Sequence, residues 1–228
     1  MRGIFHVALH VYYILLSLMF LYGDALAASA SSLEEFLRSL KSLVRLEIVT
    51  AILVFIDIAR APDCDILCRG TVLGYLAHIP AKPFLKSHRG WYHSLWAAIY
   101  VSSASSAIVT SLFYLLKTAV DLWNTDFEFS IYRVATTVFS VSLLSYTLHL
   151  IEDSLTMRGV DWFGRRIRGP VSTGRSDLYF TLLLIMFSSS IAVLVYIMTK
   201  EVSTSAVAGG LVLTAIYGLL ALSRSWRT

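Results

Sequence analysis

Charged residues are scarce in this chain. Asp, Glu, Lys and Arg make up only 15% of its 228 residues, whereas an average soluble domain has about 25%. Hydrophobic residues make up 57%, and the mean hydropathy is +0.69. A soluble fold of this length cannot bury so much apolar surface. The composition therefore excludes an ordinary soluble protein and predicts an integral membrane protein.

Several signals of other protein classes are also missing. The sequence has no Gly-rich phosphate-binding loop, no basic repeat and no basic stripe with interleaved aromatic residues. The net charge of +4 is therefore interpreted as a signal for membrane orientation, and no nucleic-acid partner is expected. The two cysteines, Cys64 and Cys68, lack the second pair that zinc sites usually show, so they are interpreted as ordinary loop residues.

Long apolar stretches predict an all-α fold, a polytopic helical bundle of about six transmembrane spans. The predicted spans are residues 4–22, 46–60, 94–116, 133–152, 178–198 and 206–223. Residues 1–27 form the first transmembrane helix or a signal segment, because Ala25-Leu26-Ala27 resembles a signal-peptidase site. Residues 28–228 are predicted to form a single membrane-embedded helical domain. An amphipathic surface helix is expected over 31–45, and a short buried or re-entrant helix over 70–79.

Basic residues are distributed unevenly between the predicted loops. Thirteen of the 19 Lys and Arg residues fall in the N-terminus, the 60–92 loop, the 154–177 loop and the C-terminal tail. Because cytoplasmic loops carry an excess of Lys and Arg, we predict a multi-pass cell-membrane protein with both termini in the cytoplasm.

Three pairs of histidines or carboxylates fall at the same predicted membrane face. They follow the second span, precede the third and end the fourth. A helix places residues four apart on one side, and an extended segment aims residues two apart in one direction. Mixed His and carboxylate ligands suit a divalent metal ion, with zinc or manganese favoured. The predicted ligands are Asp63, Asp65, His88, His93, His149 and Asp153.

The polar residues outside this ligand set are predicted to have other roles. The planar guanidinium of Arg89 can hold an anionic oxygen, and Ser94 is predicted to cap the third span rather than act as a nucleophile. His6 and His10 are interpreted as polar groups near a helix end rather than as ligands. Asp57 lies within the second span, where a carboxylate is costly and often functional. Because it is close to the helix end, contact with the interface remains an alternative.

Three sequence blocks resemble the ordered motifs of the YdjM family. They are Pro62-Asp63-Cys64-Asp65, His88-Arg89-Gly90-x-x-His93-Ser94-Leu95 and Tyr146-x-x-His149-x-x-x-Asp153-x-Leu155-Thr156-x-x-Gly159-Val160. The resemblance covers residues 45–178 and implies an inner-membrane-associated metal-dependent hydrolase, also described as LexA-binding. The chain departs from the family's pattern at two places. The Gly-His pair that family members often have near the N-terminus is absent, and Ile66 stands where a His usually follows the second Asp, here Asp65.

The leading hypothesis is therefore a membrane-bound hydrolase with a metal site at the cytoplasmic membrane face. Its expected substrate is an ester or phosphoester, either lipid-like or phosphorylated. Expected partners are membrane lipid and a cytoplasmic protein. The alternative is a non-enzymatic scaffold or transporter. The spans 94–116, 178–198 and 206–223 have no central ionisable group, which argues against ion or proton coupling.

Overall fold

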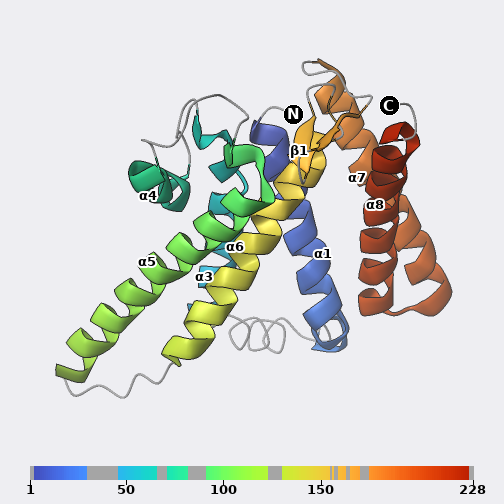
Figure 1. Ribbon diagram of the computed structural model, residues 1–228. Helices are drawn as coiled ribbons and strands as arrows, with labels where there is room; N and C mark the ends of the chain where they lie inside the picture. The colour runs from blue at the N-terminus through green and yellow to red at the C-terminus, as the bar shows by residue number, and fades with distance from the viewer. Residues whose placement is uncertain are drawn as a thin grey trace. The chain divides into compact units, whose positions relative to one another are not determined.

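The computed structural model is built almost entirely of helices (Figure 1). It describes residues 3–29, 46–65, 71–81, 91–122, 130–154, 156, 159–162, 165–169 and 175–225. The α-helices in these residues are α1 (Gly3–Ser29), α3 (Leu46–Ile58), α4 (Val72–Ala81), α5 (Leu95–Leu122), α6 (Ile131–Ser154), α7 (Arg175–Thr199) and α8 (Val202–Ser225). Two 3₁₀ turns, η1 (Ala61–Asp65) and η3 (Trp91–His93), and a hairpin of β1 (Val160–Trp162) and β2 (Arg165–Ile167) complete them. The predicted all-α class is confirmed.

Every predicted span coincides with one of these helices. Four helical stretches in the described residues are long and apolar enough to cross a membrane: His6–Asp24, Leu95–Ala119, Ile131–Ser154 and Thr181–Thr199. Helix α3 has only 13 residues, and the apolar stretch of α8 runs over Val202–Ile216. The count of six crossings therefore stays a prediction. The short helix expected over 70–79 is present as α4, whereas the amphipathic helix expected over 31–45 lies outside the described residues.

The chain divides into two compact units. The first unit consists of Met1–Ile48, Ile151–Gly159 and Arg166–Thr228, and it holds α1, the last turn of α6, α7 and α8. The second unit consists of Val49–Leu150 and Val160–Arg165, and it holds most of α3, η1, α4, η3, α5 and most of α6. Helix α6 is continuous through both, so helical geometry fixes its last turn relative to the turn before it.

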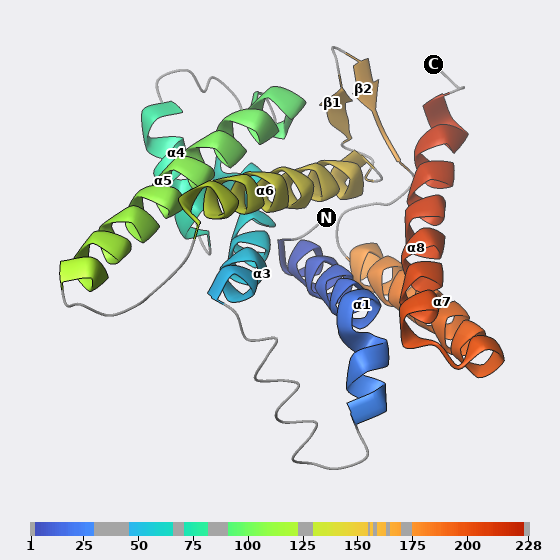
Figure 2. The ribbon, with the colours of Figure 1, turned by 90° about the horizontal axis from the view of Figure 1, so that it is seen from below.

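In the first unit, α7 and α8 run antiparallel and side by side, as both views show (Figures 1 and 2), and α1 packs against them. A small core forms where Leu9, Leu184 and Leu213 meet. Asp24, near the end of α1, accepts a 2.6 Å hydrogen bond from the backbone N–H of Val202. Because the first N–H groups of a helix lack intrahelical partners, this carboxylate caps α8 and ties it to α1.

In the second unit, α5 and α6 are antiparallel and contribute most of a core shared with α3 and α4 (Figure 1). Small residues allow helices in lipid to approach closely. Here the hydroxyl of Ser106 on α5 donates a 2.8 Å hydrogen bond to the backbone carbonyl of Ala135 on α6.

The second unit also explains Asp57, whose carboxylate caps α4. It accepts hydrogen bonds from Oγ1 of Thr71 at 3.0 Å, the N–H of Val72 at 2.7 Å and the N–H of Leu73 at 2.9 Å. A negative charge at a helix N-terminus also interacts favourably with the helix dipole. Asp57 therefore has a structural explanation, and it fixes the start of α4 against the end of α3.

Helix α4 packs very closely on the turn that follows α3. A Cβ atom built on Gly74 would lie 2.8 Å from the Cβ of Ala61, closer than real Cβ atoms approach. Only glycine permits this contact without a shift of the neighbouring backbone. The α4–η1 contact determines where η1 lies, and η1 carries Asp63.

Candidate metal centre

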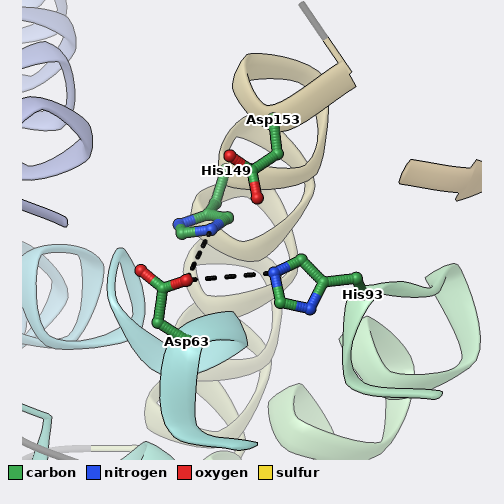
Figure 3. A group of neighbouring side chains, drawn as sticks. All are labelled: Asp63, His93, His149 and Asp153. Carbon is green, nitrogen blue, oxygen red and sulfur yellow. Dashed lines mark ion pairs between the residues drawn. The ribbon is translucent and has the colours of Figure 1, made fainter. Parts of the chain in front are cut away.

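Three separate parts of the second unit bring polar side chains to one point. Asp63 comes from η1, His93 from η3 and His149 from α6 (Figure 3). Oδ1 of Asp63 lies 3.9 Å from Nε2 of His93 and 3.9 Å from Nε2 of His149. Asp153 follows one helical turn after His149 on α6 and completes the group. One ligand atom from each of the four residues lies within 4.8 Å of all the others.

His149 is held in a definite orientation. Its Nδ1 lies 2.7 Å from the backbone carbonyl oxygen of Ala59. Since a carbonyl only accepts hydrogen bonds, Nδ1 carries the hydrogen and donates it. Nε2 faces Asp63, and in the neutral form of the ring it presents a lone pair there. This is the arrangement by which proteins orient metal-ligating histidines.

The position of His93 is set by the residues on either side of it. Tyr146 on α6 donates a hydrogen bond from its hydroxyl to the backbone carbonyl of Tyr92, which fixes η3 against α6. On the other side, Oγ of Ser94 accepts a 3.3 Å hydrogen bond from the N–H of Ala97. The prediction that Ser94 caps the helix beginning at Leu95 is confirmed.

The distances and the donor set fit a divalent ion. At 3.9 Å the carboxylate and imidazole atoms are too far apart for a hydrogen bond. Two ligands of a tetrahedral ion lie about 3.4 Å apart, given metal–ligand distances of about 2.0–2.2 Å. The two pairs at 3.9 Å would have to close by about half an ångström around an ion, and the widest pair, at most 4.8 Å apart, by up to about 1.4 Å. Two imidazoles and two carboxylates could therefore hold a metal ion here.

The group is enclosed except on one side. His93, His149 and Asp153 are 0% exposed, whereas the side chain of Asp63 is 34% exposed. Water or a small ligand can therefore reach the group past Asp63, whereas the two imidazole rings are shielded from solvent.

Comparison with known proteins adds the family. The model of the family described as YdjM inner membrane protein matches residues 7–227. The chain belongs to the YdjM family. No curated protein and no solved structure matches it. The resemblance suggested by the motifs is confirmed, and the family description agrees with the apolar helices in making this a membrane protein.

The other predicted site residues of this YdjM protein cannot be placed in the group. The backbone of Asp65 belongs to η1, but its side chain lies outside the described residues. His88 and Arg89 also lie outside them. The roles predicted for these three residues stay predictions.

A turn that closes α6 accounts for part of the YdjM-like motif. The backbone carbonyl of Asp153 accepts hydrogen bonds from the N–H of Thr156 at 3.0 Å and from its Oγ1 at 2.7 Å. The N–H of Gly159 then donates to the carbonyl of Thr156 at 3.1 Å. Gly159 has φ of +66°, a conformation that favours glycine. The turn holds the end of the helix that bears His149 and Asp153.

Sequence reasoning missed a second set of buried polar residues, which lies in the first unit. Nδ1 of His6 contacts Oε2 of Glu152, and Nε2 of His6 lies 3.4 Å from Oδ1 of Asp153. Nδ1 of His10 lies 3.7 Å from Oε1 of Glu152. All four side chains are 0% exposed. The four-residue spacing of His6 and His10, like that of His149 and Asp153, was the available signal, because it places both on one helix face.

Proposed function

We propose that this YdjM-family protein is a membrane-bound metal-dependent hydrolase acting on an ester or phosphoester. The observation that carries the proposal is the convergence of Asp63, His93, His149 and Asp153 within 4.8 Å. Imidazole and carboxylate ligands favour zinc or manganese as the resident ion.

A divalent ion in this group would supply Lewis acidity that polarises an ester or phosphoester oxygen. The protein's own residues would do the positioning. The bond from His149 to the carbonyl of Ala59 keeps Nε2 directed at the centre before any ligand arrives. Asp63, the partly exposed member, borders the route by which water and substrate enter. Arg89 stays the predicted partner for an anionic oxygen of the substrate.

The surroundings of the group support the proposed substrate class. Helices α5 and α6, which flank it, are apolar enough to span a membrane, so a substrate has to approach at the membrane surface. A lipid-like or phosphorylated molecule meets this condition. The excess of basic residues in the flanking loops supports a cytoplasmic location for the group and for both termini.

The first experiment measures bound metal. Detergent-solubilised wild-type protein, loaded with Zn²⁺ or Mn²⁺ and desalted, should retain a stoichiometric divalent ion, and His149→Gln and His93→Ala should each retain less. His78→Gln is the matched control, because His78 lies on α4 with its ring 5.4 Å from that of Tyr92 and is not a member of the group. The metal proposal fails if the wild type retains no stoichiometric ion or if His149→Gln and His93→Ala retain as much as the control.

A second experiment tests the reaction. Nitrophenyl carboxylic and phosphate esters in mixed micelles should be hydrolysed by the metal-loaded wild type, and His149→Gln should lose that activity while His78→Gln keeps it. Stoichiometric metal without hydrolysis of any such ester would overturn the hydrolase assignment and leave a metal-binding membrane protein.

A third experiment tests on which side of the membrane the loop with Cys64 and Cys68 lies. A membrane-impermeant maleimide should label Cys64 and Cys68 in permeabilised cells and not in intact cells. Labelling in intact cells would place this loop outside and contradict the cytoplasmic location.

A further inference from the structure

The buried end of α6 carries two adjacent carboxylates, Glu152 and Asp153, in an environment that disfavours negative charge. Both are 0% exposed, and both lie in the last turn of the helix, where the partial negative charge of the helix dipole repels them. Burying a carboxylate without a compensating cation is strongly unfavourable. A positive charge is therefore expected beside them.

The residue that faces both carboxylates is His6. Its Nδ1 contacts Oε2 of Glu152, and its Nε2 faces Oδ1 of Asp153 at 3.4 Å. The two contacts differ in kind. The first is a hydrogen bond between imidazole and carboxylate, whereas 3.4 Å exceeds the usual length of an N–H···O bond and equals the separation of about 3.4 Å between two ligands of a tetrahedral ion.

This pattern matches a recurring arrangement in metalloproteins. There, a carboxylate accepts the hydrogen of one ring nitrogen of a histidine, and the other ring nitrogen binds the ion. In this chain Glu152 takes the place of the orienting carboxylate. Nε2 of His6 points toward Asp153, and Oδ1 of Asp153 is the oxygen donor that faces it at 3.4 Å.

His10 supports the same geometry. It lies one turn after His6 on α1, and its Nδ1 donates a 2.7 Å hydrogen bond to the backbone carbonyl of His6. The ring thereby stays 3.7 Å from Oε1 of Glu152. Oε1 itself accepts no hydrogen bond from the described residues, although it is fully buried.

We infer that His6 and Asp153 bind a divalent cation, with Nε2 and Oδ1 as donors and Glu152 as the positioning residue for His6. This assigns a ligand role to a residue in the first turns of α1, which belongs to none of the motifs in residues 45–178. Asp153 is a member both of this proposed cation site and of the group formed by Asp63, His93 and His149. The inference itself depends only on the contacts of His6 with Glu152 and Asp153, which all belong to the first unit.

The test compares metal binding by single variants of the full-length protein in detergent. His6→Gln should lose about one equivalent of Zn²⁺ or Co²⁺, because it removes a donor. Glu152→Gln keeps an oxygen that can accept from Nδ1 of His6 but lacks the charge, and its affinity should fall about 10–100-fold, as for other residues that orient a ligand. In the Co²⁺-loaded protein both variants should alter the visible absorption spectrum of the bound cobalt.

Tyr12→Phe is the matched control. Tyr12 also lies on α1, and its hydroxyl bonds to Ser188 at 3.0 Å and to Ser189 at 2.9 Å on α7. The control should keep the wild-type metal content and cobalt spectrum. Unfolding temperatures in excess EDTA separate ligation from folding. A purely structural role for Glu152 would lower the stability of the metal-free protein and leave affinity unchanged, and that result would overturn the inference.

The outcomes also separate this inference from the proposed function. If His149→Gln loses metal and His6→Gln retains the wild-type content and affinity, the inference is wrong and the proposed hydrolase centre stands. If His6→Gln loses metal and His149→Gln does not, the cation position at His6 stands and the proposed centre fails.

Discussion

Replacing Gly74 by alanine tests whether the packing of α4 on η1 positions the metal group. A Cβ at this position would lie 2.8 Å from the Cβ of Ala61, 3.0 Å from its Cα and 2.6 Å from Oγ1 of Thr71. Carbon atoms in good contact lie about 3.5–4.0 Å apart. The two backbones must therefore separate by about 0.7–1.2 Å at the Ala61 Cβ to admit the methyl group.

A displacement of this size reaches Asp63, because Ala61 and Asp63 belong to the same short turn. Metal–ligand distances tolerate shifts of only about 0.2 Å, so the carboxylate would leave the range in which it shares an ion with His93 and His149. We expect the affinity for Zn²⁺ to fall at least about tenfold, at the low end of the effects seen for residues that orient ligands. Overpacking should also lower the free energy of unfolding by about 1–3 kcal/mol.

The assay is a competition titration of Zn²⁺ between a chromophoric chelator and the solubilised protein. Gly210→Ala is the matched control, because a Cβ at Gly210 on α8 meets nothing within 4 Å, and it should bind zinc as the wild type does. The double variant Ala61→Gly, Gly74→Ala removes the Cβ–Cβ overlap and should recover part of the affinity. If Gly74→Ala alone binds zinc within about twofold of the wild type, the α4–η1 packing does not position the ligand.

Three further substitutions test individual contacts. Asp57→Ala removes the cap of α4 and should cost about 1 kcal/mol of unfolding free energy, measured by chemical denaturation in mild detergent, and an unchanged midpoint would contradict the capping role. Gly159→Ala forces a side chain into φ of +66° and onto the carbonyl of Ile167; it should cost at least about 1–2 kcal/mol, and a wild-type unfolding temperature would refute the strained turn. Tyr146→Phe removes the donor to the carbonyl of Tyr92 and should weaken Zn²⁺ binding about tenfold through His93; unchanged affinity would show that η3 holds its position without that bond.

The helices could be predicted from sequence because a membrane allows few alternatives. Backbone polar groups inside lipid must be satisfied within the segment, so a long apolar stretch is almost always a helix. Each predicted span therefore coincides with a helix, and the end points differ by at most seven residues. The hairpin at β1 and β2 was not predicted, because three-residue strands within a basic loop leave no clear periodicity in the sequence.

The site was partly predictable for a topological reason. Alternating spans return the chain to the same face, which predicts that Asp63, His93, His149 and Asp153 lie at one membrane surface. One ligand atom from each of these four residues lies within 4.8 Å of the others, and their role as metal ligands stays a prediction. The contact of His6 with Glu152 spans 146 positions of the sequence and depends on how α1 packs within its unit, which no local spacing reveals.

The distribution of buried charge bears on the choice between an enzyme and a transporter. Among the described residues, the fully buried His, Asp and Glu side chains are His6, His10, His93, His149, Glu152 and Asp153. Each belongs to one of two groups that share Asp153, and the buried polar side chains elsewhere in the described helices are Ser and Thr. A proton or ion pathway needs ionisable groups at successive depths along the membrane. Within each unit the described ionisable groups instead lie close together, which favours localised binding of a metal ion over a continuous pathway.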